Sequence, residues 1–485
     1  MLLFPVMTNG VFAQSDSLGR YLETAARNNP GVKADFLAYQ ASLQKIPQAG
    51  AIPDPQLDMG FFLPSMDVID GRRIADFTLM QMFPWFGSRK AAQTEAGHMA
   101  NMAFEKFRES RDNLYLQVYT QWFLLCSLRQ QLINSRENKD YLTQLETLAL
   151  RRFSASQGGN PASGGRSQAS PAAAGSMGAA GNMGNAGAMG SSMGETATRS
   201  STTGGTTSSM SSGAVMQNMS ASPGMSEALR IQLEIIELEN NIESILSAIK
   251  AETAKFNALL NRPADSSIQL PDSIEQIPFL LNVAETMEKI TGRNPMLGMI
   301  NEEEAAYKAK AEMNKKMSYP MLGIGLQYSV TGKRMDMNPT GIPVTEMNGI
   351  DMIMPMVSVS IPIYRNKYKA QQKESDYLRQ ASREAYSDAR NELEAELYRN
   401  KHQLDDAARK ITLYEKQTQL ALTTYNLVVQ EFVSGKSELT DVIQVQRQLS
   451  DYRLKKAEAV ADYNTMVTAI QKLISFNDNE YNTIK

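Results

Sequence analysis

The two halves of this sequence repeat each other, and this duplication constrains the fold more than any other feature. Asn29-Pro30 recurs 265 positions later as Asn294-Pro295, and each pair lies within an Ala/Glu/Lys-rich pattern typical of a helix. Each half therefore encodes a helix, two strands, a long helix and a further helix. Three more segments recur in the same order, at offsets of 265, 278 and 279: residues 55–60 as 320–325, 83–90 as 361–368 and 152–156 as 431–435.

The first half also carries an insert, because the offset between matching segments falls from 279 to 211 after residue 224. Residues 156–223 are rich in Gly, Ser, Ala, Thr and Met and contain no aromatic residue. Such a composition cannot bury enough apolar surface to offset the entropy of ordering, so we expect a disordered segment at the turn between two long helices. The predicted organisation is a first repeat at 14–261 containing this insert, a linker at 262–278, a second repeat at 279–475 and a tail at 476–485.

Four segments alternate between apolar and small or polar residues, as one-sided β-strands do. They are residues 57–63, 76–79, 321–330 and 357–361. This pattern fits membrane β-strands, although a small soluble sheet packed on a helix would show it too. Four strands cannot close a barrel, and an open sheet edge is not tolerated in lipid. If the strands lie in a membrane, several chains must share one barrel, and three chains would supply twelve strands.

Two helical hairpins are predicted, one in each half, and both are too long for a compact core. Residues 366–432 contain no proline and would form about 100 Å of helix. Gly435 ends this helix, and Ser437 is placed to cap the next one, 438–475. The first half has the same hairpin at 88–152 and 225–261. Two heptad seams in 366–432 predict coiled-coil packing: Leu397, Leu404, Ile411, Thr418, Tyr425 and Phe432, and Leu393, Asn400, Ala407, Tyr414, Ala421 and Val428.

Charge and composition exclude several classes of function. With 49 basic and 52 acidic residues the chain has no basic footprint for nucleic acid. The single cysteine, Cys126, cannot form an internal disulfide and is expected in a helix seam; His98 and His402 cannot build a histidine metal site and are expected on the surface. No Ser/His/Asp set or phosphate-binding loop is present, so no enzyme activity and no cofactor are predicted. Residues 1–13, ending in Val11-Phe12-Ala13, resemble a short signal peptide and indicate export.

In these features the chain resembles the TolC-type outer-membrane efflux proteins over most of residues 18–475. The motifs that carry the resemblance are the Asn-Pro pair of each half and residues 52–57, 81–87 and 435–443; residues 81–87 are most like the heavy-metal efflux branch. The resemblance implies a mixed, mostly α fold. It implies a homotrimer with a twelve-stranded barrel in the outer membrane of a Gram-negative bacterium, continued by a periplasmic tunnel of twelve helices. An inner-membrane pump and a periplasmic adaptor would complete the exporter.

Family members gate their tunnel at the helical tip, where an aspartate pair can ring the constriction. Asp441 occupies the first of these positions, but Gln444 stands at the second, so the ring would carry half the charge. The counterpart of Asp441 in the first half is Arg230, and a link between them could hold the gate closed. The simpler alternative for Asp441 is a solvated or helix-capping carboxylate.

Methionine is the unusual residue, with 29 copies. Thioether sulfur is a soft ligand suited to Cu(I) and Ag(I), and a Gly/Ser-rich chain would let several converge on one ion. We therefore expect transient metal contacts in the insert, unless the insert is only a spacer. Met80 and Met82 are expected in the barrel wall, and six others around the loop between the last two strands: Met335, Met337, Met347, Met352, Met354 and Met356. The candidate metal-binding residues of the insert are Met177, Met183, Met189, Met193, Met210, Met216, Met219 and Met225.

The leading hypothesis is an outer-membrane exit duct that exports copper or silver, or another heavy metal, from the periplasm or cytoplasm. One alternative is a multidrug or secretion channel in which the insert is incidental. The other is a periplasmic coiled-coil adaptor or scaffold without a pore.

Overall fold

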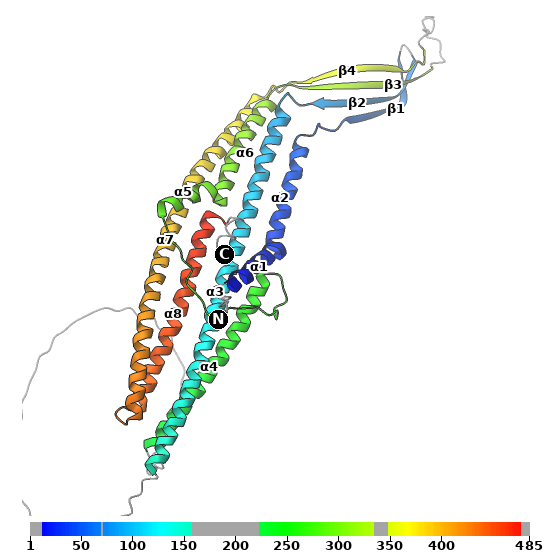
Figure 1. The fold of residues 1–485 in the computed structure, drawn as a ribbon. Coiled ribbons are helices and arrows are strands. Elements are labelled where there is room, and N and C mark those ends of the chain that lie inside the picture. The colour runs from blue at the N-terminus through cyan, green and yellow to red at the C-terminus, as the bar shows by residue number, and fades with distance from the viewer. Residues whose placement is uncertain (1–11, 69–70, 158–222, 334–347, 477–485) are drawn as a thin grey trace, which may run out of the picture. The chain divides into compact units, whose positions relative to one another are not determined.

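The computed structural model describes residues 12–68, 71–157, 223–333 and 348–476 (Figure 1). Both halves have the order two helices, two strands, a long helix and a further helix, so the fold is mostly α with one small sheet. The first half contains α1 (Phe12–Asn28), α2 (Pro30–Ala49), β1 (Gln56–Val68), β2 (Gly71–Phe83), α3 (Ser88–Gln157) and α4 (Pro223–Leu259). The second half contains α5 (Val283–Arg293), α6 (Pro295–Met317), β3 (Met321–Gly332), β4 (Met352–Ser360), α7 (Arg365–Val433) and α8 (Leu439–Ile474).

Each half begins with two helices where the sequence predicts one, and the break lies at the Asn-Pro pair. Proline suits the first position of a helix, because it has no N–H to leave unpaired. The Asn29 side chain accepts hydrogen bonds from the backbone N–H groups of the first turn of α2. Asn294 caps α6 in the same way. At each break one helix ends and a second helix begins with an asparagine N-cap.

The same two asparagines also connect each break to the last helix of its half. Asn29 Nδ2 donates to the carbonyl of Leu259, at the end of α4, over 3.0 Å. Asn294 Nδ2 donates to the carbonyl of Leu473, near the end of α8, over 2.8 Å. Carbonyls at the end of a helix have no partner inside the helix, so these amides satisfy groups that would otherwise be left open.

The four strands form one antiparallel sheet in the order β1-β2-β3-β4, and the β2–β3 pair joins the two halves. The register places the start of β1, the end of β2, the start of β3 and the end of β4 at the same end of the sheet: Gln56 lies opposite Met80, Phe83 opposite Leu322, and Met321 opposite Ser360. All four connections to helices are therefore made at this end of the sheet (Figure 1).

Strand β4 begins earlier than the predicted start at 357, and this corrects the placement of three methionines. Met352, Met354 and Met356 lie within β4 and not in the loop before it. Met335, Met337 and Met347 lie outside the described residues.

Two compact units divide the chain: residues 1–139 with 238–485, and residues 140–237. In the larger unit one hydrophobic cluster gathers α1–α4 around Trp122 and Phe256, and includes Cys126, as expected. A second cluster gathers α5–α8. The predicted heptad seams of α7 supply much of it, and their members Leu393, Leu397, Asn400, Leu404, Ala407, Ile411, Ala421 and Phe432 are buried.

The smaller unit contains the end of α3 and the start of α4. Leu142, Leu145 and Ile231 are buried in it, and Gln232 Nε2 donates to Glu146 Oε1 over 2.8 Å. Most of the predicted insert, residues 158–222, lies outside the described residues, as do residues 1–11 and 477–485.

The segment that joins the two halves has no helix or strand between residues 262 and 282, and buried asparagines hold both of its ends. Asn257 Nδ2 donates to the carbonyls of Ala264 and Ser266, each over 2.9 Å. At the other end Asn464 accepts from the N–H of Ile277 over 2.9 Å and donates to the carbonyl of Glu275 over 2.8 Å.

Replacing Asn294 with alanine should destabilise the protein more than the loss of an ordinary helix cap. The variant loses the cap of α6 and leaves the buried Leu473 carbonyl unpaired, which together cost about 2–4 kcal/mol. Denaturant unfolding of the purified protein measures the loss. The control is Asn282→Ala, which removes only a 3.4 Å capping bond to the N–H of Glu285 and should cost about 0.5–1 kcal/mol. Equal losses in the two variants would contradict the closing role of Asn294.

Candidate functional site

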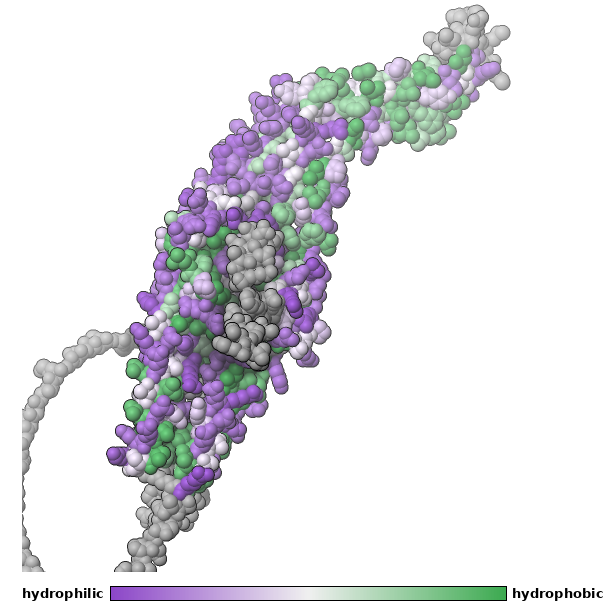
Figure 2. Space-filling view, in the orientation of Figure 1, coloured by the Kyte–Doolittle hydropathy of each residue, from purple (hydrophilic) through white to green (hydrophobic). Residues whose placement is uncertain are grey.

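The sheet presents one continuous apolar face. Cross-strand neighbours share a face, so Leu57, Leu79 and Leu326 form one row and Met59, Phe77 and Tyr328 the next. Their apolar neighbours on β3 and β4 are well exposed, with Ile324 at 62% and Val357 at 78%. Figure 2 shows hydrophobic colour gathered over these strands, whereas hydrophilic colour covers much of the helices.

No described helix packs on this apolar face. Neither hydrophobic cluster of the described residues contains a residue of β1–β4. A small soluble sheet packed on a helix, the alternative that the sequence left open, would require such contacts. Within the same ranges, no helix is long and apolar enough to cross a membrane.

The opposite face of the sheet carries small and polar residues together with several methionines of β2, β3 and β4. On β3 it is formed by Gly323, Gly325, Gln327 and Ser329, which alternate with the apolar residues. Thr78 and Ser358 lie on this face in the neighbouring strands. The sheet is thus amphipathic, with a sharply different environment required on each side.

Aromatic and basic residues occur in the four segments that connect the strands to the helices. We call these segments, residues 49–55, 84–90, 315–320 and 361–369, the junction collar. Trp85 stacks on Tyr319 with ring centroids 5.5 Å apart, and Phe86 and Tyr364 are more than four-fifths exposed. One acidic residue, Asp54, occurs in the collar. Against it stand seven basic residues: Arg89, Lys90, Lys315, Lys316, Arg365, Lys367 and Lys369.

The tip between α7 and α8 is a capped turn. Gly435 has a φ of 78°, a conformation that glycine adopts without strain. The N-cap of α8 is Glu438, so the predicted cap at Ser437 is wrong by one residue. Asp441 accepts from the N–H of Glu438 over 3.3 Å, and the Ser437 hydroxyl donates to the same carboxylate over 3.0 Å.

Of the predicted gate residues, Asp441 and Gln444 are both exposed on α8, three positions apart and so on one side of the helix. The capping role foreseen as the simpler alternative for Asp441 is present. Arg230 belongs to the smaller unit, and its link to Asp441 stays a prediction.

The predicted metal-binding methionines of the insert fall almost entirely outside the described residues. Seven of them, from Met177 to Met219, lie there, and Met225 lies in the first turn of α4. Within the described ranges, no group of three or more His, Cys, Asp or Glu side chains is placed to hold a metal ion.

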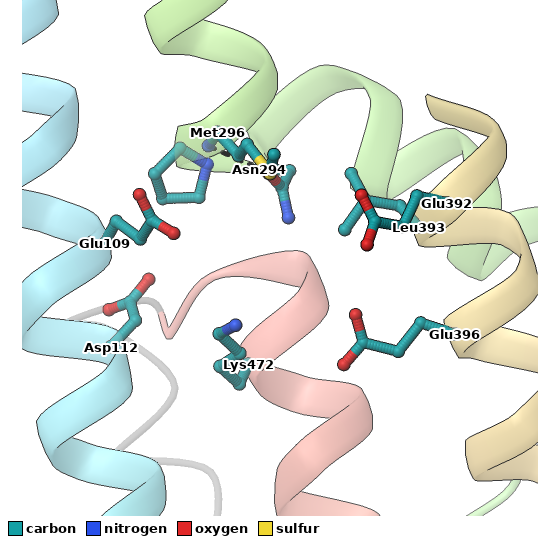
Figure 3. Close-up of a pocket in the computed structure, with 9 residues that line it drawn as sticks. Glu109, Asp112, Asn294, Met296, Glu392, Leu393, Glu396 and Lys472 are labelled. Carbon is teal, nitrogen blue, oxygen red and sulfur yellow. Dashed lines mark hydrogen bonds between the residues drawn. The ribbon is translucent and has the colours of Figure 1, made fainter. Parts of the chain in front are cut away.

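Acidic residues from both halves line a cavity of about 120 Å³ that the sequence did not reveal. Glu109 and Asp112 of α3 face Glu392 and Glu396 of α7, with Lys472 of α8 between them (Figure 3). These residues are remote in the chain, and each reads as an ordinary charge on a helix surface. Only the packing of the two repeats against each other brings them together.

Asp112 is the buried member of this group, with a side chain 1% exposed. The Ser475 hydroxyl donates to its Oδ2 over 2.5 Å, and Arg111 Nη2 lies 3.3 Å from Oδ1. Burial raises the pKa of Asp112, and the bonds from Ser475 and Arg111 oppose this rise.

A second contact between the repeats corrects the prediction for His98. Its Nδ1 lies 2.7 Å from Glu302 Oε2 of α6, and the side chain is about one-third exposed. Asn101 Nδ2 donates to the same carboxylate over 3.2 Å. His98 is therefore part of the interface between α3 and α6. His402 is exposed, as expected.

The raised pKa of Asp112 predicts a pH-dependent contribution to stability. A folded pKa above the ordinary value of 3.8 gives a contribution that is fully present below that value and is lost as the pH rises through the folded pKa. Thermal unfolding of the wild type and Asp112→Asn, measured from below pH 3.8 upward, should therefore show that the stability of the wild type relative to the variant decreases as the pH rises.

The control for this experiment is Asp406→Asn, because the bond from Lys410 lowers the pKa of the exposed Asp406. Its contribution has the opposite sign: it is present above pH 3.8 and is lost as the pH falls through the folded pKa. A pH-independent difference between the wild type and Asp112→Asn would contradict the assignment to Asp112.

Comparison with known proteins agrees with this architecture. Residues 286–475 match the family described as outer membrane efflux protein. No curated protein sequence matches the chain significantly. Three solved structures resemble it at low sequence identity. The outer membrane protein VceC of Vibrio cholerae has a TM-score of 0.65 at 12% identity, over 95% of this chain and 96% of VceC.

The channel protein CusC also has a TM-score of 0.65 at 12% identity, over 98% of this chain and 96% of its own. The outer-membrane channel OprN has a TM-score of 0.64 at 10% identity, over 96% of this chain and 92% of OprN. The chain thus has the fold of these three proteins along nearly its whole length, and residues 286–475 match the family of outer membrane efflux proteins.

Proposed function

We propose that this chain is the outer-membrane exit duct of a tripartite efflux system in a Gram-negative bacterium. The observation that carries the proposal is the amphipathic sheet, whose exposed apolar face has no partner among the described helices. Lipid would cover the apolar face and water the polar one, as in transmembrane barrels. The family match of residues 286–475 and the fold of the whole chain support the same function.

The sheet has two edges, β1 and β4, and lipid does not tolerate open edges. A homotrimer would pair β4 of each chain with β1 of the next and close a barrel of twelve strands. The long helices would continue as a periplasmic tunnel, where an adaptor and an inner-membrane pump dock. The junction collar suits the boundary between lipid and water, since aromatic rings favour that level and basic side chains can meet phosphate headgroups.

We further propose that the cargo is Cu(I), Ag(I) or another heavy metal, captured transiently by the methionines of the insert. The support is the softness of thioether ligands and the position of the insert at the helical tip, where cargo or adaptor would arrive. Asp441 and Gln444, with Arg230 as a partner, would form the gate there, and adaptor contact would open it by untwisting the helices. The chain would act as a passive duct without chemistry of its own.

Two alternatives have specific consequences. In a multidrug or secretion channel the architecture would be the same and the insert incidental. A periplasmic adaptor or scaffold without a pore would have to leave the apolar face of the sheet in water.

Two neighbouring residues of β3 test the membrane role, because they lie on opposite faces of the sheet. Leu326→Lys places a charge on the apolar face, and near the middle of a bilayer this costs about 2–4 kcal/mol per chain. Gln327→Lys places the same charge on the polar face. We expect Leu326→Lys to reduce the amount of trimer extracted from outer membranes and Gln327→Lys to leave it near the wild-type level. Equal, soluble expression of both variants would instead favour the scaffold.

Survival on copper and silver tests the cargo. Cells lacking the protein should grow less well than wild-type cells at raised Cu or Ag concentrations, and cells lacking only residues 157–223 should show an intermediate loss. Outer-membrane trimer levels, measured in parallel, control for assembly. Normal metal tolerance without the protein would overturn the cargo proposal, and normal tolerance without the insert would make the insert a spacer.

A further inference from the structure

At least six methionines lie on the polar face of the sheet: Met321 opposite Ser360 at the start of β3, and five more spread over the next four cross-strand rows. Gly323 is flanked by Met82, and Gly325 by Met80 on one side and Met356 on the other. Met354 lies opposite Gln327, and Met352 opposite Ser329. Successive rows are two residues, about 6.5–7 Å, apart along a strand. We call Met82, Met80, Met356, Met354 and Met352 the methionine ladder.

Two glycines of β3 lie beside the first methionines of this ladder. A Cβ atom at Gly323 would lie 2.6 Å from Met82 Sδ and would also collide with Ser358 Oγ. A Cβ atom at Gly325 would lie 3.6 Å from the terminal methyl of Met356. Because Gly323 has no side chain, the Met82 thioether can lie over β3, whereas the distance from Gly325 to Met356 is an ordinary van der Waals contact.

Thioether groups converge at this point. Ser358 Oγ lies 3.6 Å from Met80 Sδ and 3.7 Å from Met82 Sδ, so both sulfur atoms contact the same hydroxyl. All five methionines keep part of their surface exposed, and Met352 and Met354 are each 47% exposed. These side chains are therefore partly accessible to solvent.

At the far end of the ladder lies a carboxylate, that of Asp76, which is paired with Arg73. Asp76 lies across Ser329 from Met352, on the same face. Its Oδ2 is 3.8 Å from Arg73, and its Oδ1 is buried without a hydrogen-bond partner among the described groups. A cation moving along the ladder would meet this carboxylate after the last methionine.

We infer that the methionine ladder is a series of weak binding sites for a soft monovalent metal ion, Cu(I) or Ag(I), on the inner wall of the duct. The inference rests on the proposed function, because only a barrel with its apolar face in lipid turns the polar face toward a lumen. Thioether sulfur binds soft ions and is a poor ligand for hard ones, and several weak sites in series allow an ion to enter and leave. The ion is bound and released without a change of oxidation state.

The ladder differs from packing by flexible side chains. Methionine often fills gaps in apolar cores, but these five residues lie beside Thr78, Gln327, Ser329 and Ser358, away from the apolar face. Leucine would provide similar apolar surface there without a metal ligand. Substitution by leucine therefore separates the two roles.

Methyl NMR of the full-length trimer in detergent, labelled at the methionine methyl groups, tests the ladder residue by residue. Met80→Leu, Met82→Leu and Met356→Leu assign three signals, and Met59→Leu assigns a control on the apolar face. Titration with Ag(I) should shift the three ladder signals and leave that of Met59 in place, whereas Zn(II) should shift none of them. Unshifted ladder signals, or an equal shift of Met59, would overturn the inference.

Silver tolerance provides the second measurement. The triple leucine variant should lower the survival of cells on Ag(I), with outer-membrane trimer at the level of Met59→Leu cells; unchanged survival would count against the ladder. Failure of the wild-type protein to form an outer-membrane trimer would overturn the proposed function. A trimer that protects against Ag(I) but shows no ladder shift would leave that function standing and overturn the ladder alone.

Discussion

In each half of the chain, one asparagine connects the first helices of that half to the end of its last helix. Its carbonyl oxygen caps the helix that leads to the strands, and its amide nitrogen binds the end of the last helix of the same half. The chain thereby returns beside its own beginning after two strands and two long helices. Because both halves close in this way, the strand pair of each half leaves its helices in a similar place, and β2 and β3 can pair to form one sheet.

Much of this architecture could be predicted from the sequence, because it depends on long periodic patterns. The helix predicted at 366–432 is Arg365–Val433, and the alternation at 321–330 is strand β3. The Asn-Pro pairs mark the repeat in the sequence. Their function as helix breaks is not evident there, because an Ala/Glu/Lys-rich pattern continues across them and their hydrogen-bond partners, Leu259 and Leu473, lie about 180 to 230 residues away.

Other features could not be predicted because they depend on pairing between distant segments. The alternation of apolar and polar residues predicts a strand only from residue 357, whereas β4 begins at Met352 and includes Pro355, which is tolerated because β4 is an edge strand in the sheet of one chain. The neighbourhood of the β4 methionines with Met80 and Met82 follows only from the strand register. In the same way, the burial of Asp112 and the contact of His98 with Glu302 arise where α3 of the first half meets the second half.

The segment between the halves restricts how the α7–α8 tip can move. Asn464 is hydrogen-bonded to the backbone at residues 275 and 277, and Asn257 to the backbone at the other end of the same segment, at residues 264 and 266. The C-terminal part of α8 is therefore connected, through residues 264–277, to the end of α4. A movement of the α7–α8 tip that left these hydrogen bonds intact would have to be taken up between Leu439 and Asn464, where α8 is also bonded to α3 through Gln446 and Asn138.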